Sequence, residues 1–260
     1  MSFGKPIFVL KFGGTSVKTI ARMQHAASIV GDFCKLGKVV VVVSAMGDTT
    51  DHLLTLASQC SETPDRRELG VLLSTGEQVS IALFSIVLRG CGLTAKSFTG
   101  AQAGIVTESC HGSARIVDLD CKNLKAALRD NDVCVVAGFQ GVTVDGDITT
   151  LGRGGSDTTA VALAAALKAT ECHVFTDVDG IFSADPNRVA NAEFYPEIGY
   201  EECLNLVNAG AQVMHDRAVS LAKQYGVVLR VRNTFKPEHD GTLIAQLDGN
   251  LQRTRDEAAA

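Results

Sequence analysis

The sequence predicts an α/β fold, a three-layer αβα sandwich with a mostly parallel central sheet. Short β-branched runs alternate along the chain with stretches in which apolar residues recur at helical spacing. The run Val39–Val43 is all valine, as expected for a strand that is buried on both faces of a parallel sheet. Strand–helix alternation of this kind places helices on both faces of the sheet. A chain of 260 residues, 46% of them hydrophobic, can bury a sizeable core.

The expected elements follow one another in this alternation. Strands are predicted at Ile7–Leu10, Val39–Val43, Val133–Ala137, His173–Thr176 and Val227–Val231. Helices are predicted at Ile20–Leu36, His52–Gln59, Leu69–Leu88, Ser156–Ala169, Glu201–Val207 and Ala218–Tyr225. No internal repeat and no linker rich in Ser, Gly or Pro divides the sequence. We therefore expect one domain over residues 1–250, followed by a tail over residues 251–260.

Charge and composition exclude several classes of protein. The 24 Lys and Arg residues and 29 Asp and Glu residues leave a net charge of −5, which argues against a partner that is nucleic acid or an anionic membrane. The apolar runs are far shorter than the ~20 residues that span a bilayer, and the apolar run in Met1–Leu10 is too short for a signal peptide. The eight cysteines form no C-x-x-C pair, which favours buried, reduced thiols and a cytoplasmic location.

A first glycine-rich turn, Lys11–Ser16, follows the first predicted strand and precedes a helix. Paired glycines let backbone N–H groups approach an anion, and the helix N-terminus adds a positive dipole. Lys11 directs a cation to the same place. Gly13 and Gly14 alone would equally fit a plain turn, but together with the lysine and two hydroxyl residues they favour phosphate binding.

A second turn, Thr149–Thr159, has three glycines within four positions and precedes a helix rich in alanine and leucine. One of Ser156 and Asp157 is expected to be the N-cap of that helix. Capping does not require Arg153, whose planar guanidinium is suited to grip a carboxylate.

A third turn, Thr176–Pro186, continues from the strand at His173–Thr176 as an acidic tight turn and an extended polar loop. Its aspartates and glycine would equally fit Asx-turn chemistry. All three turns follow predicted strands, and open α/β sheets bind ligands at the carboxyl ends of their strands. The sequence has no P-loop, no G-x-G-x-x-G before the first helix, no G-x-S-x-G and no H-E-x-x-H, and its six histidines are scattered.

Several motifs in order resemble the catalytic domain of aspartate kinases, within the amino-acid kinase family. The resemblance covers roughly residues 5–246. Besides the second and third turns, the matching segments are Val9–Val17, Val43–Asp51, Leu73–Gln78, Ser97–Ile105, Gly138–Gly141, Val231–Phe235 and Gly241–Ile244.

The resemblance implies transfer of the ATP γ-phosphate to the β-carboxylate of L-aspartate. The product, 4-phospho-L-aspartate, begins the biosynthesis of lysine, threonine and methionine. Lys11 and Asp157 are the implied catalytic residues: Lys11 neutralises the transferred group, and Asp157 holds the catalytic cations. No general base is needed, because the attacking carboxylate is already ionised. The expected cofactors are ATP and Mg²⁺, with Mg²⁺ bridging phosphate oxygens, so no protein metal ligand is predicted.

The same resemblance assigns the binding residues. Those for the nucleotide are Lys11, Phe12, Gly13, Gly14, Ser16, Thr176, Asp177, Phe182, Ser183, Asp185 and Pro186. Those for the substrate are Ser44, Thr50, Glu77, Phe139, Arg153, Gly154, Gly155 and Ser156. Arg153 is expected to pair with a substrate carboxylate and Glu77 with the α-ammonium group. Without the motif, Glu77 would be interpreted as a solvated helix residue.

The chain departs from the family pattern at its nucleotide side and at its end. Phe182 stands where relatives usually have tyrosine, and Asn187 precedes Arg188 where relatives have arginine directly after Asp-Pro. Some relatives have lysine at the position of Phe235, and the adjacent Lys236 receives no role. The chain ends about where regulatory ACT domains usually begin, so none is expected within it. A homodimer is the expected assembly, and a separate regulatory subunit stays open as a partner.

Two other functions remain as alternatives. One is an ATP-dependent kinase of another amino acid or acidic metabolite, which Arg153, Glu77 and Thr50 disfavour because they suit a dicarboxylic amino acid. The other is a non-catalytic nucleotide-binding subunit, which the presence of Lys11 and Asp157 disfavours.

Overall fold

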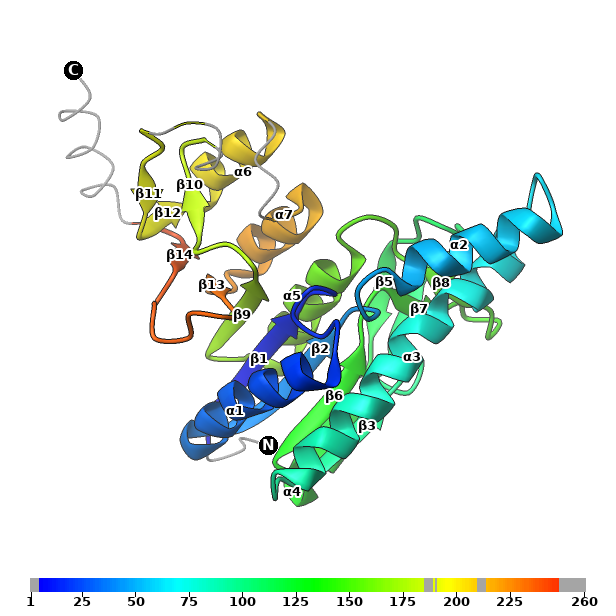
Figure 1. Cartoon of the computed structure of the whole chain (residues 1–260), viewed down its shortest axis with the longest axis horizontal. Coiled ribbons are helices and arrows are strands. Elements are labelled where there is room, and N and C mark those ends of the chain that lie inside the picture. The colour runs from blue at the N-terminus through cyan, green and yellow to red at the C-terminus, as the bar shows by residue number, and fades with distance from the viewer. Residues whose placement is uncertain (1–4, 185–188, 190, 210–213, 248–260) are drawn as a thin grey trace.

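One eight-stranded sheet organises the computed structural model, which describes residues 5–184, 189, 191–209 and 214–247 (Figure 1). The strand order is β12-β14-β13-β9-β1-β2-β6-β3, and β13 and β14 are the one antiparallel pair of neighbours in this described sheet. In chain order the strands are β1 Ile7–Phe12, β2 Lys38–Val43, β3 Ala95–Phe98, β6 Val133–Ala137, β9 Glu171–Thr176, β12 Glu197–Gly199, β13 Leu229–Asn233 and β14 Thr242–Ala245.

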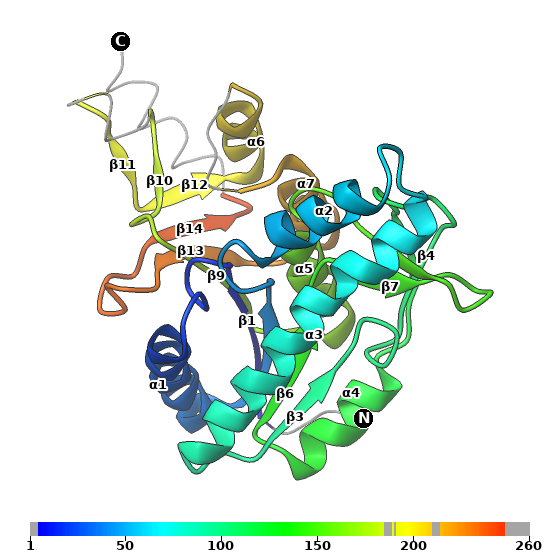
Figure 2. The ribbon, with the colours of Figure 1, turned by 45° about the vertical axis from the view of Figure 1, so that its right-hand side comes forward.

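Helices cover both faces of this sheet, which confirms the predicted three-layer α/β fold (Figure 2). One face carries α1 and α3, and the other carries α4, α5, α6 and α7. The helices are α1 Ile20–Leu36, α2 Thr49–Cys60, α3 Arg66–Gly90, α4 Lys122–Asp130, α5 Gly155–Leu167, α6 Tyr200–Asn208 and α7 Asp216–Tyr225.

The valines of β2 show why the sheet is buried on both sides. Val39, Val41 and Val43 point into the core beneath α1 and α3, whereas Val40 and Val42 point into the core beneath α5 and α7. All five are fully buried. Because successive side chains of a strand face opposite sides, an unbroken valine run stabilises both cores at once.

Two small sheets lie outside the main one. One contains β4 Ile105–Thr107, β5 Ile116–Leu119, β7 Gln140–Val142 and β8 Ile148–Thr150, in the order β5-β4-β7-β8. The other pairs β10 Ile181–Phe182 with β11 Phe194–Tyr195. The sequence did not predict these strands, because segments of two to four residues are too short to show a period of two. It also missed α4, whose nine residues contain a single short apolar face.

The carboxyl ends of four central strands lie level at one edge of the sheet. Phe12 pairs with Val43 on one side and with Phe175 on the other, and Val43 pairs with Ala137. The first turn leaves β1 at this edge, and the third turn leaves β9. The second turn meets the same edge through Leu151, whose N–H donates to the carbonyl of Phe139 directly after β6 (2.8 Å). The structure therefore confirms that the three turns share one edge.

Helix α3 is long and apolar enough to cross a membrane by length and composition alone, with a mean hydropathy of 1.7 over its best window of 18 residues. Half of that window is buried inside the fold. Its inner face packs Ile81, Phe84 and Leu88 into the core beneath α1. A core helix of a globular protein meets the same criteria, so α3 is weak support for a membrane span.

The cysteines are less uniformly buried than the sequence suggested. Cys121, Cys134, Cys172 and Cys203 are buried, but Cys60, Cys91 and Cys110 are exposed, and all eight are free thiols. Burial raises the pKa of Cys121 to about 11 and those of Cys134 and Cys203 to about 12. The buried thiols therefore stay protonated and pack as small apolar side chains.

Substitution by alanine should have opposite effects on stability at Gly31, inside α1, and at Gly37, its C-cap. A Cβ at Gly31 meets no atom within 4 Å, whereas a Cβ at Gly37 collides with the carbonyl oxygen of Pro6. We expect Gly31→Ala to raise the free energy of unfolding by about 0.5–1 kcal/mol, because helical glycine is entropically costly. Gly37→Ala should lower it by about 3 kcal/mol. Urea denaturation measures both, and equal effects would contradict the close approach of α1 and the N-terminal strand.

Candidate active site

An ion pair between Lys11 and Asp157 lies at the carboxyl edge of the sheet. Lys11 is the fifth residue of β1 and Asp157 lies in the first turn of α5, which packs against β1. The Lys11 Nζ and Asp157 Oδ1 atoms are 2.7 Å apart, and the two side chains are 12% and 13% exposed. The structure thus brings together the two residues predicted to be catalytic, with a cation held at the foot of the first turn.

The first turn leaves no room for a side chain at Gly14. A Cβ on Gly14 would stand 2.9 Å from the carbonyl oxygen of Ala45, whereas one on Gly13 would make only an ordinary contact of 3.5 Å with the Lys11 Nζ. The Gly13 N–H donates to the carbonyl of Phe175 in β9 (3.3 Å), and the Gly47 N–H donates to the carbonyl of Gly14 (3.1 Å). The turn is therefore held between the strands on both sides of β1.

Two residues predicted to contact the nucleotide have side chains that point into the protein. Phe12 is fully buried and stacks on Phe175 with ring centroids 4.8 Å apart. Ser16 is also fully buried, and its hydroxyl shares a 2.6 Å hydrogen bond with that of Thr234. The Phe12 side chain therefore belongs to the core, its carbonyl accepts from the Ser44 N–H, and Ser16 supports the turn from inside the protein.

The second turn depends on glycines in the left-handed region. Gly152 has φ +76° and Gly154 has φ +65°, and a Cβ on Gly154 would collide with the ring of His215. Helix α5 begins at Gly155, and Gly154 is its N-cap. The prediction that Ser156 or Asp157 caps the helix was wrong, because both residues already lie within its first turn. Their position places Asp157 beside Lys11, and the helix N-terminus adds a partial positive charge there.

Glu77 is buried in α3 with one oxygen unpartnered. Its side chain is 3% exposed, its Oε1 accepts from the Ala45 N–H at 3.0 Å, and its Oε2 is buried without a hydrogen-bond partner. Burial raises the pKa of Glu77 to about 7. An uncompensated buried carboxylate is costly unless a cation or a donor joins it. This arrangement suits a site that receives a cationic group from outside.

Phe139 and Ser156 lie between the sheet and the second turn. Phe139 has φ +67°, an uncommon conformation for a residue with a side chain. Hydrogen bonds keep it there: its N–H donates to the Thr159 hydroxyl (3.2 Å), and its carbonyl accepts from the Leu151 N–H (2.8 Å). Ser156 packs so closely that a Cβ on Gly138 would stand 2.6 Å from its hydroxyl oxygen. Strained backbone of this kind clusters at functional sites.

The sequence profile of the amino acid kinase family matches residues 6–233. The chain belongs to this family.

Its relatives with curated names include aspartokinases. The aspartokinase of Geobacillus stearothermophilus is 54% identical over 241 residues, which are 92% of this chain and 59% of that protein. Aspartokinase 2 of Bacillus subtilis strain 168 is 52% identical over 241 residues, with the same shares of 92% and 59%. The chain thus spans about three fifths of the length of these relatives.

Solved structures agree with this assignment. The aspartate kinase from Synechocystis has a TM-score of 0.83 at 46% identity, covering 93% of this chain and 40% of that one. Aspartokinase III of E. coli, in complex with aspartate and ADP, has a TM-score of 0.86 at 27% identity, covering 94% and 65%. A UMP kinase from Bacillus anthracis, at 19% identity and a TM-score of 0.66, shows the shared fold alone.

Three other residues of this amino acid kinase family member are expected to bind substrate, and they make few hydrogen bonds within the protein. Ser44 follows β2 and donates its N–H to the carbonyl of Phe12 (3.2 Å). Thr50 lies half-buried in the first turn of α2. Arg153 is exposed, and within the described residues its guanidinium has no hydrogen bond or ion pair. An unengaged arginine at the edge of the second turn is available to a ligand.

The third turn is described only up to residue 184. The Thr176 hydroxyl donates to Asp177 Oδ1 at 3.2 Å, and Asp177 is exposed. Phe182 packs against Phe194 with centroids 5.3 Å apart, and the Ser183 hydroxyl accepts from the Glu193 N–H (2.9 Å). Asp185 and Pro186, together with the departures at Asn187 and Arg188, lie outside the described residues.

Sequence reasoning missed the residues that support the third turn from β13 and the loop after it. The Asn233 amide donates to Asp179 Oδ1 (2.6 Å), and Lys236 Nζ lies 2.7 Å from Asp179 Oδ2. These contacts hold the pKa of Asp179 below its usual value. The Thr234 N–H also donates to the carbonyl of Thr176 (2.8 Å). No sequence signal links residues more than 50 positions apart, although the motif containing Asn233 marked the segment.

The described residues contain no group of three or more His, Cys, Asp or Glu side chains that could hold a metal ion.

A cavity of about 320 Å³ opens beside Phe139. Its lining comes from α3, the β4–β5 loop and β8: Arg66, Leu69, Gly70, Leu73, His111, Gly112, Ser113 and Thr150. The site therefore offers cations, backbone donors and one buried carboxylate, which suits binding of an anionic group beside an ammonium group.

The raised pKa of Glu77 predicts a stability that depends on pH. Between the ordinary value of 4.5 and about 7, the folded protein keeps a proton that the unfolded chain has released. The stabilisation is therefore full below pH 4.5 and is lost as the pH rises through about 7. Glu77→Gln removes this titration, so the variant should gain roughly 3 kcal/mol over wild type across this range.

Denaturant unfolding at several pH values measures this difference. The exposed Glu62→Gln is the matched control and should follow the wild-type profile. Parallel profiles of wild type and Glu77→Gln would contradict a buried, proton-binding carboxylate.

Proposed function

We propose that this chain is the catalytic part of an aspartate kinase that transfers the γ-phosphoryl group of ATP to the β-carboxylate of L-aspartate. The observation that carries the proposal is the Lys11–Asp157 pair, held 2.7 Å apart at the ligand-binding edge of the sheet. The names of the relatives support it, although the chain spans 59% of the length of the first two. The product, 4-phospho-L-aspartate, would enter lysine, threonine and methionine biosynthesis in the cytoplasm.

Phosphoryl transfer requires positioning and cations rather than a base. A β-carboxylate oxygen forms the new P–O bond while the bond from the γ-phosphorus to the bridging oxygen breaks, and ADP leaves with that oxygen. The carboxylate is already ionised near neutral pH, so no proton has to be removed. Lys11 would offset the charge on the equatorial oxygens, and the Gly14 N–H would face the same group, while the Gly13 N–H stays bonded to the Phe175 carbonyl. Asp157 would fix the Lys11 ammonium in place.

Two charges of the site suit a dicarboxylic amino acid. The buried, half-partnered Glu77 would accept the α-ammonium, and the unengaged Arg153 would pair with a carboxylate. Ser44, Thr50, Phe139, Gly154, Gly155 and Ser156 would complete the substrate contacts. A kinase of another acidic amino acid is the second candidate, because Glu77 and Arg153 suit the ammonium and carboxylate groups that all such substrates share.

The nucleotide would lie along the third turn. Thr176 and Asp177 would meet the base and ribose, with Phe182, Ser183, Asp185 and Pro186 along the rest of the nucleotide. Magnesium would be carried by the phosphate oxygens, because the Asp157 carboxylate at this edge is already paired with Lys11. When bound, the metal would supply charge neutralisation on the phosphates.

A coupled ADP-release assay with Mg-ATP tests this proposal. We expect turnover with L-aspartate, and none with L-glutamate or without an acceptor. Lys11→Ala should lower kcat by about a thousandfold, because a cation that faces the transferred group is lost. The control is Lys18→Ala, since the exposed Lys18 pairs with Asp48 beside the same turn and should be dispensable. Near-normal turnover of folded Lys11→Ala would contradict the role of the first turn.

We also infer a homodimer through the outer face of α3. Val79 and Ile86 lie on that face and are 52% and 66% exposed. Between Glu68 and Arg89 the helix has no charged residue except the buried Glu77. An exposed, uncharged apolar stripe of this length favours burial against another surface, and a second copy of the same helix is complementary to it.

Ile86→Glu should therefore convert the dimer to a monomer in sedimentation velocity. The control Val144→Glu, at a side chain 87% exposed on the β7–β8 turn, should leave the mass unchanged. A dimer that persists in Ile86→Glu would place the interface elsewhere.

A further inference from the structure

We propose that Arg217 is a positioning residue that holds the second turn in the shape needed to bind the acceptor. Arg217 lies in the first turn of α7, 66 residues after Leu151 of the second turn, and no sequence motif marks it. Its guanidinium donates from Nη1 to the carbonyl of Leu151 (2.7 Å) and from Nη2 to the carbonyl of Ala114 (3.2 Å). One side chain thus joins α7, the second turn and the β4–β5 loop.

The second turn needs such a clamp because its backbone is soft. Glycine populates positive and negative φ about equally, so Gly152 and Gly154 do not impose the shape of the turn on their own. Leu151 lies directly before these glycines, and the peptide groups on both sides of its Cα are held. The Leu151 N–H donates to the Phe139 carbonyl (2.8 Å), and the Leu151 carbonyl accepts from Arg217 (2.7 Å). With both peptide planes fixed, the direction in which the chain enters Gly152 is set.

The β4–β5 loop adds a second attachment. The Ala114 N–H donates to the Thr150 carbonyl (3.0 Å), while the Ala114 carbonyl accepts from Arg217. A Cβ on Gly152 would stand 3.2 Å from the Gly112 carbonyl oxygen, so this loop lies directly against the turn. Arg217 therefore braces the turn and its neighbouring loop together. Losing a charged donor would leave two carbonyls without this partner, and the Leu151 residue is fully buried.

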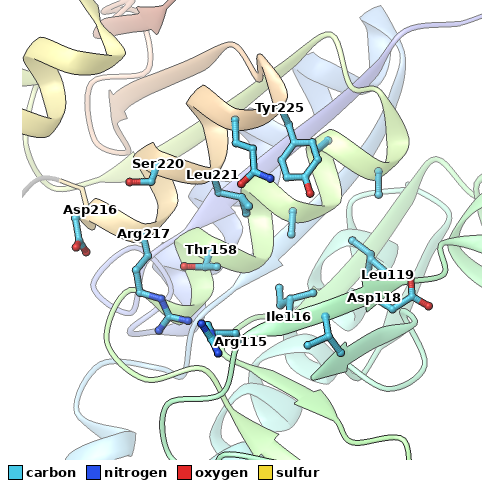
Figure 3. Close-up of a pocket in the computed structure, with 15 residues that line it drawn as sticks. Arg115, Ile116, Asp118, Leu119, Thr158, Asp216, Arg217, Ser220, Leu221 and Tyr225 are labelled. Atoms are coloured by element: carbon cyan, nitrogen blue, oxygen red, sulfur yellow. The ribbon is translucent and has the colours of Figure 1, made fainter. Parts of the chain in front are cut away.

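Arg217 borders an open groove of about 570 Å³ between β5, α5 and α7 (Figure 3). The groove is also lined by Arg115, but the side chain of Arg115 bonds to Glu108 rather than to the second turn. Figure 3 shows the two guanidinium groups at the same end of the groove. The two residues carry equal charge and line the same groove, but Arg217 is half-buried on the second turn, whereas Arg115 is exposed and bonds to Glu108.

Steady-state kinetics separate positioning from general stability. This inference rests on the proposed aspartate kinase activity. We expect Arg217→Ala to raise the KM for aspartate about tenfold while the KM for ATP and kcat change less than about twofold, because only the acceptor side is displaced. Arg217→Lys should fall between, since a lysine is a point donor that cannot span both carbonyls. Arg115→Ala should match wild type.

Chemical rescue provides a second readout. Because the groove is open, added guanidinium ion should lower the aspartate KM of Arg217→Ala, whereas sodium chloride at equal ionic strength should not. A rise in both KM values together, a loss of kcat alone, or no rescue beyond the salt control would each overturn the proposal.

Amide hydrogen exchange tests whether Arg217 holds the second turn and the β4–β5 loop, independently of activity. If wild type shows no turnover with aspartate, the proposed function is refuted, but the role of Arg217 in holding the turn is still tested. Exchange in residues 112–116 and 150–155 should be faster by about tenfold in Arg217→Ala and unchanged in Arg115→Ala. Equal exchange in wild type and Arg217→Ala would overturn the role of Arg217.

Discussion

The Lys11–Asp157 ion pair is the interaction on which the rest of the site depends. It joins the end of the central strand β1 to the start of α5, and both side chains are nearly buried. Removing one partner of a buried pair leaves a desolvated charge, which typically costs about 3–5 kcal/mol. The pair therefore fixes where α5 begins relative to the first turn. It also keeps a cation beside the first turn and the N-terminus of α5, where the proposed function would place a phosphate group.

The acceptor side of the site is built on a different constraint. Glycines allow the second turn to pass close to His215, but the same freedom deprives it of a preferred shape. Contacts from outside the turn compensate, from Phe139 on one side and from α7 on the other. The start of α7 thus helps to shape the second turn, although the two segments lie far apart in the sequence. Under the proposed function, the shape of the acceptor site would depend on a helix that need not touch the substrate.

Glu77 illustrates how one helix can serve both packing and chemistry. The inner face of α3 packs into the core, and the same burial that stabilises this packing raises the pKa of Glu77 to about 7. The unpartnered oxygen is a cost to the free protein. A bound ammonium group would offset that cost, so binding of an amino acid and ionisation of Glu77 favour each other.

The sequence by itself determined the layered α/β fold, the long strands and helices, and the three turns at one edge of the sheet. These follow from local patterns: valine runs, helical periodicity, and glycines directly after strands. The family motifs marked Lys11, Asp157 and Glu77. The sequence could not show that Gly154, rather than Ser156 or Asp157, caps α5, because that choice depends on the packing of His215 against Gly154.

Only the tertiary structure decided which side chains face a ligand and which support the site from behind. Phe12 and Ser16 lie in motifs that suggest binding, yet their side chains are buried against Phe175 and Thr234. A family motif contains Asn233 and none marks Arg217, but neither residue's sequence context shows that it holds the third or the second turn. The physical reason is distance along the chain: hydrogen bonds between residues 54 to 218 positions apart arise only when the sheet brings their strands and helices together.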